Sequence, residues 1–242
     1  MSHSTIAISP THQLKEAIIL AGGLGTRLRS AVPDLPKCMA PVNGKPFLGY
    51  IIHSLQVQGV ERFIFSLGYM HEVVTAYLSE AFPTLSHDLV IEDTPLGTGG
   101  AIQLACSKAQ EQQVLVTNGD TFFDVQVAEL SALHVQKGSA CTLCLKPMQQ
   151  FDRYGVVTVD TDGRITSFKE KQWYNEGLIN GGVYALNVAA LLQSKMPEKF
   201  SFEKAFLEAR FHEQPMYGIV QDGYFIDIGI PEDYLKAQTD FL

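Results

Sequence analysis

The sequence predicts an α/β fold in which a mixed, mainly parallel sheet is flanked by helices and continues into an antiparallel half. Short apolar runs alternate with helical patterns up to about residue 137, as in successive β–α–β units. Beyond Gly138 the pattern changes, and strands at 156–160 and 164–170 flank a turn that is typical of a hairpin. A chain of 242 residues, 46% of them hydrophobic, can bury a core of that size.

Each expected element follows from a local pattern. In the first half, strands are expected where apolar runs lie between turn residues, at 17–20, 62–67, 88–92 and 113–117. Helices are expected between them, at 45–58, 71–82 and 101–110. Thr98 is the expected N-cap of the third of these helices. In the second half, 140–145 is typical of a strand, Ser201 of a helix N-cap, and Pro231 of the first residue of the last helix.

Composition and charge limit the classes of partner. The formal net charge of −8 and the lack of a basic stripe argue against nucleic acid. No apolar run approaches the roughly 20 residues that cross a bilayer, and residues 1–14 lack the features of a secretion signal. The four cysteines have no framework spacing, and on a strand the side chains of Cys141 and Cys144 would face opposite ways. We therefore expect a cytoplasmic protein with no membrane partner and with buried strand cysteines.

A glycine-rich loop at 22–25 follows the first expected strand, and Arg27 lies just beyond it. Glycine lets backbone N–H groups approach an anion, and a guanidinium can grip two phosphate oxygens, so the loop is typical of a polyphosphate site. A dinucleotide-binding turn is disfavoured because Leu28 stands where its third glycine belongs. The Gly-Lys pair at 44–45 lacks the Ser or Thr of a P-loop. An ordinary strand-to-helix turn remains the alternative.

Two further loops carry candidate ligand-binding groups. Lys37 lies between Pro36 and Pro41, which stiffen the backbone around its charge, although a solvated lysine is the alternative. The glycine-rich loop at 97–100 leads into a helix and can expose N–H groups to a nucleotide base or simply cap that helix.

Asp120 and Asp227 are the candidate metal ligands. Asp120 follows the strand 113–117, at the edge where ligands of open α/β sheets bind, or else it caps the next segment. Asp227 interrupts an apolar strand, and an unpaired buried carboxylate costs several kcal/mol, on the order of the penalty for an isolated charge. A divalent cation, Mg²⁺ or Mn²⁺, would relieve that cost.

The segments Gly-Gly-x-Gly-Thr-Arg-Leu at 22–28 and Pro-Lys-x-Met-x-Pro-Val at 36–42 resemble the signature of sugar nucleotidyltransferases, which join a sugar 1-phosphate to a nucleoside triphosphate. The similarity continues from Lys15 to Gln238, with Cys38 where many relatives carry proline. It implies a Rossmann-like fold with an antiparallel sugar-binding lobe. A tail at 1–14 would precede a single domain over 15–242, divided into a nucleotide lobe at 15–137 and a sugar-phosphate lobe at 138–242. Homodimerisation is left open.

The resemblance also implies a role for each motif residue. Arg27 would grip the leaving pyrophosphate, Lys37 the α-phosphate, and Asp120 and Asp227 the metal ion. The implied nucleotide-binding residues are Leu20, Ala21, Gly22, Gly23, Gly25, Thr26, Arg27, Lys37, Glu92, Gly97, Thr98, Asn118 and Gly119. The implied sugar-phosphate-binding residues are Tyr154, Gly155, Glu170, Lys171, Asn180 and Gly181.

Within the family, the segments at 151–155, 177–182, 199–204 and 222–234 are most similar to guanylyltransferases of D-glycero-α-D-manno-heptose 1-phosphate. This implies GTP and that sugar phosphate as substrates. Mannose 1-phosphate and other bases are the alternatives within the family, and an inactive nucleotide-sugar-binding regulator is a remote one. Glu92 can accept both donors of the Watson–Crick edge of guanine, or it can cap a turn while the backbone reads the base.

Overall fold

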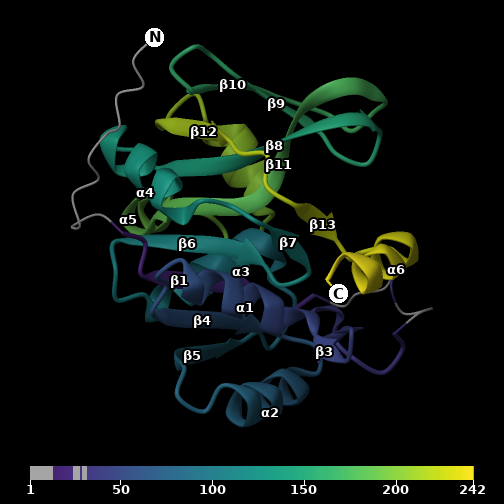
Figure 1. Ribbon diagram of the computed structural model, residues 1–242. Helices are drawn as coiled ribbons and strands as arrows, with labels where there is room; N and C mark the ends of the chain where they lie inside the picture. The colour runs from purple at the N-terminus through teal and green to yellow at the C-terminus, as the bar shows by residue number, and fades with distance from the viewer. Residues whose placement is uncertain (1–12, 24–27, 29–31, 242) are drawn as a thin grey trace.

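The structure is a computed structural model, and it describes residues 13–23, 28 and 32–241. In this part of the chain, the largest sheet has nine strands and carries helices on both faces (Figure 1). Its parallel half is formed, in spatial order, by β5 (Ser86–Ile91), β4 (Arg62–Leu67), β1 (Glu16–Leu20) and β6 (Gln113–Asn118). Because neighbouring strands are parallel, the loops that follow them lie along one edge of the sheet.

The antiparallel half continues the same sheet from β6. β11 (Tyr174–Asn187) runs antiparallel to β6 and to β8 (Cys141–Phe151), and β12 (Met216–Val220) pairs with β8 in parallel. β9 (Val156–Val159) and β10 (Ile165–Lys169) form the predicted hairpin, which joins β11 through Ile179. The register of β11 against β8 shifts between Asn180 and Tyr184, where Gly182 has a φ of 73°. This irregularity lies beside the site described below.

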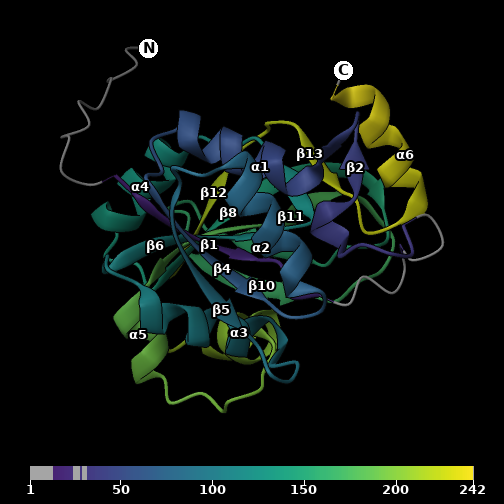
Figure 2. The ribbon, with the colours of Figure 1, turned by 90° about the horizontal axis from the view of Figure 1, so that it is seen from below.

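The sheet divides the hydrophobic core into two clusters, and helices cover each of them. The cluster on one face includes residues of α1 (Phe47–Val57), α2 (His71–Ala81), α4 (Val127–Gln136) and α6 (Pro231–Asp240). The cluster on the other face includes residues of α3 (Gly97–Ala105), α5 (Val188–Gln193) and η3 (Phe202–Glu208). Figure 2 shows α1 and α3 on opposite sides of the sheet. In β1, Ala17 and Ile19 belong to the first cluster and Ile18 to the second, as the alternation of a strand requires.

Cys141 and Cys144 confirm the expected strand arrangement. Both thiols are free and fully buried. Cys141 packs in the cluster on the α3 side and Cys144 in the cluster on the α1 side. Burial raises the pKa of both thiols well above the usual value.

Short elements shape the loops around the parallel edge. β2 (Pro41–Val42) and β3 (Lys45–Pro46) form a hairpin, and η1 (Lys37–Met39) precedes it. The two turn residues, Asn43 and Gly44, have φ values of 48° and 75°, as a type I′ turn requires. The predicted helix at 45–58 therefore begins two residues later, at Phe47. The remaining elements are η2 (Cys106–Lys108), β7 (Thr121–Phe123) and β13 (Phe225–Asp227).

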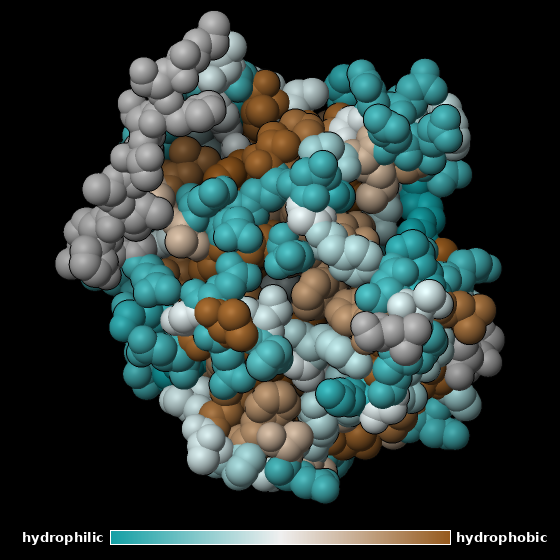
Figure 3. All heavy atoms as spheres, in the orientation of Figure 1, coloured by the Kyte–Doolittle hydropathy of each residue, from teal (hydrophilic) through white to brown (hydrophobic). Residues whose placement is uncertain are grey.

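Leu14, which the sequence assigned to the tail, packs in the core and is 1% exposed. The preceding residue, Gln13, donates a hydrogen bond to the carbonyl of Gln58. Polar side chains cover most of the face shown in Figure 3, and apolar side chains gather over β12 near the top of the view. In the described part of the chain, no helix combines the length and apolar character that crossing a bilayer requires.

His134 on α4 is a buried polar residue with both ring nitrogens engaged. Nδ1 lies 2.9 Å from Oγ1 of Thr142, and Nε2 lies 2.7 Å from Oε1 of Gln113. Burial lowers the pKa of His134 from 6.5 to about 4. The folded protein therefore keeps this imidazole neutral at pH values where the unfolded chain protonates it.

This difference in pKa predicts a loss of stability in mild acid. Because the unfolded chain binds the extra proton between pH 6.5 and about 4, the free energy of unfolding should fall through that window as pH falls. At pH 5 the contribution of His134 amounts to about 2 kcal/mol relative to pH 7. Urea unfolding at both pH values checks this, and His134→Gln should lose correspondingly less stability than the wild type. An equal loss in both proteins would contradict the assignment.

Candidate functional site

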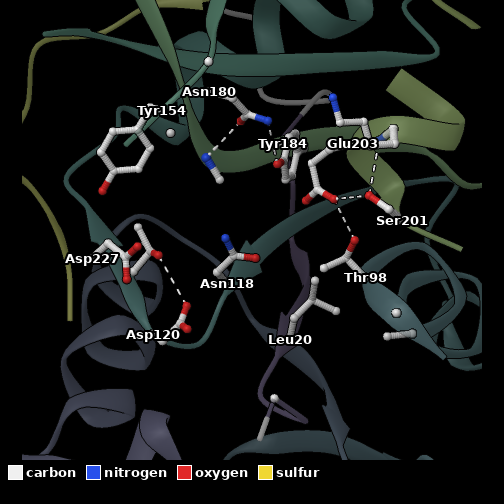
Figure 4. A pocket seen from close by; sticks show the side chains of 18 of the residues that line it. Leu20, Thr98, Asn118, Asp120, Tyr154, Asn180, Tyr184, Ser201, Glu203 and Asp227 are labelled. Carbon is white, nitrogen blue, oxygen red and sulfur yellow. Dashed lines mark hydrogen bonds between the residues drawn. The ribbon is translucent and has the colours of Figure 1, made fainter. Parts of the chain in front are cut away.

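A cavity of about 810 Å³ lies at the carboxyl edge of the parallel strands, between the two halves of the sheet (Figure 4). Both halves contribute to its lining. The predicted site residues that line it are Leu20, Gly22, Gly23, Lys37, Glu92, Gly97, Thr98, Asn118, Asp120, Tyr154, Gly155, Glu170, Lys171, Asn180, Gly181 and Asp227.

Some predicted residues are placed differently. Ala21 and Gly119 do not line the cavity. Their N–H groups already donate to backbone carbonyls, that of Ala21 to Ser66 and that of Gly119 to Leu20, each at 2.8 Å. Gly25, Thr26 and Arg27 lie outside the described residues.

Asp120 and Asp227 are brought together by a strand pair that is separate from the main sheet. β13 pairs antiparallel with β7, which places Asp227 opposite Thr121, the residue after Asp120. The N–H of Ile228 also donates to the carbonyl of Asp120, at 3.1 Å. The two aspartates therefore face the cavity side by side although they are 107 positions apart by number.

Lys37 lies between these two carboxylates. Its Nζ is 2.5 Å from Oδ2 of Asp120 and 3.3 Å from Oδ1 of Asp227. The lysine side chain is 12% exposed, so these charges attract each other more strongly than in bulk water. Cys38, the next residue, is buried, and its pKa is raised to about 12 by burial and by the nearby charge of Asp120. Its thiol thus stays protonated beside the lysine.

The carboxylate pair fits a divalent cation. Both side chains offer hard oxygen donors, and the ammonium of Lys37 shows that a cation is accommodated among them. The N–H of Gly229 donates to Oδ1 of Asp227 at 2.7 Å and fixes that carboxylate. In the described part of the chain, no group of three or more His, Cys, Asp or Glu side chains could hold a metal ion. A metal ion here would therefore complete its coordination with substrate oxygens or water.

Glu92 packs against Gly22 of the first glycine-rich loop. Its Oε2 accepts from the N–H of Leu96 at 2.9 Å, and its Oε1 accepts from Oγ of Ser66 at 3.4 Å. A Cβ on Gly22 would come within 2.8 Å of Oε1, so only glycine lets the first loop pass this carboxylate without a shift. Glu92 therefore caps a turn, which is one of the two roles that the sequence suggested. It also lines the cavity, as the other role, reading guanine, requires.

Thr98 is not the N-cap of α3, because the helix begins at Gly97 and Leu96 occupies the N-cap position. Gly97 has a φ of 72°, and the helix begins there, four residues before the expected start at 101. The Thr98 hydroxyl instead accepts from the N–H of Phe202, at 2.9 Å, at the beginning of η3. Ser201 is the N-cap of η3, as predicted, and its Oγ accepts from the N–H of Lys204 at 3.2 Å.

The antiparallel half contributes an aromatic wall and several charged groups. Tyr154 packs edge-on against Phe225, with ring centroids 6.0 Å apart. Burial and the charge of Asp227 raise the pKa of Tyr154 to about 12, so its hydroxyl stays protonated. Glu170 is 80% exposed and forms an ion pair with Lys204 at 2.5 Å, and the hydrogen bond from Lys204 lowers the pKa of Glu170.

Sequence reasoning missed several lining residues that carry hydrogen-bonding groups. These are Ser66, Thr121, Tyr184, Ser201, Glu203, Lys204 and Glu208. Ser201 was recognised only as a helix N-cap. The position of Glu203 depends on its hydrogen bond with Thr98, 105 positions away, and no local pattern in the sequence could have indicated it.

The fold and the site define an α/β protein that presents two carboxylates and a lysine at a sheet edge, and the chain belongs to the nucleotidyl transferase family, whose model matches residues 16–242. It is 49% identical over 225 residues to a D-glycero-alpha-D-manno-heptose 1-phosphate guanylyltransferase of Aneurinibacillus thermoaerophilus, covering 93% of this chain and 97% of the relative.

A second relative with the same name, from Campylobacter jejuni, is 45% identical over 219 residues, covering 90% of this chain and 96% of the relative. Among solved structures, HddC from Yersinia pseudotuberculosis complexed with GMP-PN has a TM-score of 0.83 and 38% identity. That comparison covers 94% of this chain and all of the HddC chain.

Proposed function

We propose that the protein transfers GMP from GTP to D-glycero-α-D-manno-heptose 1-phosphate, releasing pyrophosphate and forming the GDP-heptose. The observation that carries the proposal is the convergence of Asp120, Lys37 and Asp227 at a cavity shared by both halves of the sheet. The two relatives that carry this enzyme's name, 49% and 45% identical, support the choice of base and sugar.

The chemistry requires two anions to meet. An oxygen of the sugar 1-phosphate attacks the α-phosphorus of GTP, and the bond to the oxygen that bridges the α- and β-phosphorus breaks as pyrophosphate leaves. Because the acceptor is already ionised at neutral pH, the protein needs no nucleophilic side chain. Its task is alignment and charge neutralisation.

Each charged residue has a part in this task. Lys37 neutralises the charge that gathers at the α-phosphate, and Arg27 holds the departing pyrophosphate. Asp120 and Asp227 hold Mg²⁺ or Mn²⁺, which when bound supplies further neutralisation of the phosphate oxygens. These four residues constitute the proposed catalytic set.

The remaining predicted residues divide between the two substrates. The edge of the nucleotide lobe at 15–137 holds GTP, with Gly22, Gly23 and Asn118 at the cavity. Gly25 and Thr26 belong to the same sequence motif as Gly22 and Gly23 and are assigned to GTP on that basis. Glu92 reads guanine with the lone pairs that its turn contacts leave open. The lobe at 138–242 holds the sugar phosphate, with Lys171 on its phosphate. Free nucleotides and sugar phosphates are cytoplasmic substrates, and we place the activity there.

The test is a matrix of substrates. GTP, UTP, CTP, ATP and dTTP are each paired with the 1-phosphates of the heptose, mannose and glucose, and pyrophosphate release is measured. The highest kcat/KM is expected for GTP with the heptose 1-phosphate. If no combination releases pyrophosphate, the proposal is wrong. A higher kcat/KM for a different nucleotide or sugar 1-phosphate would replace the assigned base or sugar.

Lys171→Ala should weaken binding of the acceptor. Lys171 is exposed and lines the cavity beside Glu170, where an ammonium can contact a phosphate as a point charge. The KM for the sugar 1-phosphate should rise about 10-fold or more, the range of a lost charged hydrogen bond, while the KM for GTP stays within about twofold. Lys199→Ala, which removes an exposed lysine outside the cavity lining, is the matched control. An unchanged acceptor KM in the Lys171 variant would remove this residue from the site.

A further inference from the structure

Glu203 is a cavity-lining carboxylate that none of the roles above uses. It lies in the first turn of η3, and the carbonyl of Phe200, two residues before that helix, accepts hydrogen bonds from the N–H groups of Gly99 and Gly100 in α3. Figure 4 shows Glu203 together with Thr98 and Ser201 on one side of the cavity and Asp120 and Asp227 on the other. The carboxylate is therefore remote from the place where the phosphates react.

The hydrogen bonds around Glu203 have a defined direction. The hydroxyl oxygens of Thr98 and Ser201 accept from backbone N–H groups of η3, at 2.9 and 3.2 Å. Each hydroxyl then donates its hydrogen to Oε2 of Glu203, at 2.7 and 2.9 Å. Two donors satisfy the lone pairs of Oε2. Among the residues that the structure describes, no donor reaches Oε1 of Glu203, so this oxygen is an open acceptor held by a fixed carboxylate.

Tyr184 supplies a complementary donor in the same cavity. Its side chain is 2% exposed, and its hydroxyl oxygen accepts from Nδ2 of Asn180 at 2.9 Å. The Asn180 amide is itself oriented, because its Oδ1 accepts from the N–H of Gly182 at 3.0 Å. Burial, together with the charge of Glu203, raises the pKa of Tyr184 and keeps its phenol protonated. The hydroxyl hydrogen of Tyr184 has no acceptor in the described part of the chain and is available to a ligand.

An open acceptor beside an open donor is suited to hydroxyl groups, each of which can donate and accept. A phosphate would be repelled by the carboxylate, so this side of the cavity does not suit the triphosphate. We propose that Oε1 of Glu203 and the hydroxyl of Tyr184 bind the exocyclic hydroxyls of the sugar, and that Glu203 accepts from the one that mannose lacks. Glu203 is then the residue that sets the preference for heptose over mannose 1-phosphate. This inference rests on the proposed function.

The geometry of the substrate agrees with this placement. The reacting phosphate is on C1 of the sugar and must lie near Asp120, Asp227 and Lys37. The exocyclic carbons extend from C5, which the ring oxygen separates from C1, and this chain leads away from the phosphate, while Glu203 is on the far side of the cavity. Mannose has one exocyclic hydroxyl and the heptose has two, so the additional hydroxyl is what a heptose-selective site must recognise.

The test compares Glu203→Gln with the wild type on both acceptors. Gln keeps the size of the side chain and removes its charge, so kcat/KM for heptose 1-phosphate should fall about 10- to 100-fold, the range for a lost charged hydrogen bond. With mannose 1-phosphate the fall should stay below about threefold, because that acceptor lacks the hydroxyl. Calorimetry should show a matching rise in the Kd for heptose 1-phosphate, with the KM for GTP unchanged. Glu213→Gln, an exposed glutamate paired with Arg210 outside the cavity lining, is the matched control.

Folding of each variant is checked by its thermal unfolding. Should Glu203→Gln fail to fold, Tyr184→Phe deletes only a hydroxyl and must itself lower the kcat/KM for heptose 1-phosphate. Equal losses on both acceptors, or no loss on heptose 1-phosphate, would overturn the inference. A wild type that releases no pyrophosphate with any sugar phosphate would overturn the proposed function, and the inference with it. If the wild type is active and the Glu203→Gln variant keeps the same preference for heptose over mannose 1-phosphate, the inference alone is overturned.

Discussion

Asp120→Asn is expected to reduce kcat by at least about 100-fold, in the range found when one electrostatic contact to a transition state is removed. The carboxylate of Asp120 is one of two that converge on the same cation position, with Oδ2 2.5 Å from Nζ of Lys37. Asparagine keeps the shape and one oxygen, but it loses the negative charge that a divalent cation requires. The affinity for Mn²⁺, used as a spectroscopic substitute for Mg²⁺, should therefore fall together with the rate.

The matched control is Asp124→Asn. Asp124 lies four positions later in the chain, is exposed and does not line the cavity, so its variant should keep the wild-type rate and metal affinity. Unaltered turnover of Asp120→Asn in saturating Mg²⁺ would show that Asp120 is not a metal ligand in the reaction.

Lys37→Met should lower kcat by about 100-fold or more for a different reason. Methionine keeps most of the apolar stem and removes the ammonium that lies between Asp120 and Asp227. Without that positive charge the two carboxylates repel each other, and a divalent cation becomes their remaining neutralising partner. The affinity for Mn²⁺ should therefore stay the same or increase while the rate falls.

These two variants separate metal binding from stabilisation of the α-phosphate. Titration of each protein with Mn²⁺, followed by its paramagnetic resonance signal, gives the affinity independently of catalysis. Lys45→Met is the control, because Lys45 is exposed in the β3 strand and does not line the cavity. A Lys37 variant that loses Mn²⁺ affinity as Asp120→Asn does would mean that the lysine organises the metal site and has no separate part in the reaction.

The sequence predicted features that depend on local patterns. The strand at 62–67 coincides with β4, because an apolar run of that length between turn residues has few other solutions. Ser201 was correctly predicted as an N-cap for the same reason. The hairpin at Asn43-Gly44 was missed although the Asn-Gly pair is a strong turn signal, because Pro46 was interpreted as part of a helix start.

Features that depend on contacts distant in sequence could not be predicted in this way. The position of Asp227 beside Asp120 results from the pairing of β13 with β7, which no periodicity specifies. Thr98 was expected to cap its own helix, but its hydroxyl accepts from the N–H of Phe202 in another one. The open acceptor on Glu203 likewise exists only because two segments about 100 positions apart meet at the cavity. The motif residues indicated the chemistry, and the tertiary contacts add the groups that can distinguish one sugar from another.

The late position of β13 in the chain has a consequence for synthesis on the ribosome. All nine strands of the large sheet have been translated by Val220, before the ribosome reaches Asp227. Asp227, the partner of Asp120, is therefore the last of the described cavity-lining residues to be synthesised. A chain that terminates before Phe225 would contain every strand of the large sheet and would lack the second carboxylate of the site.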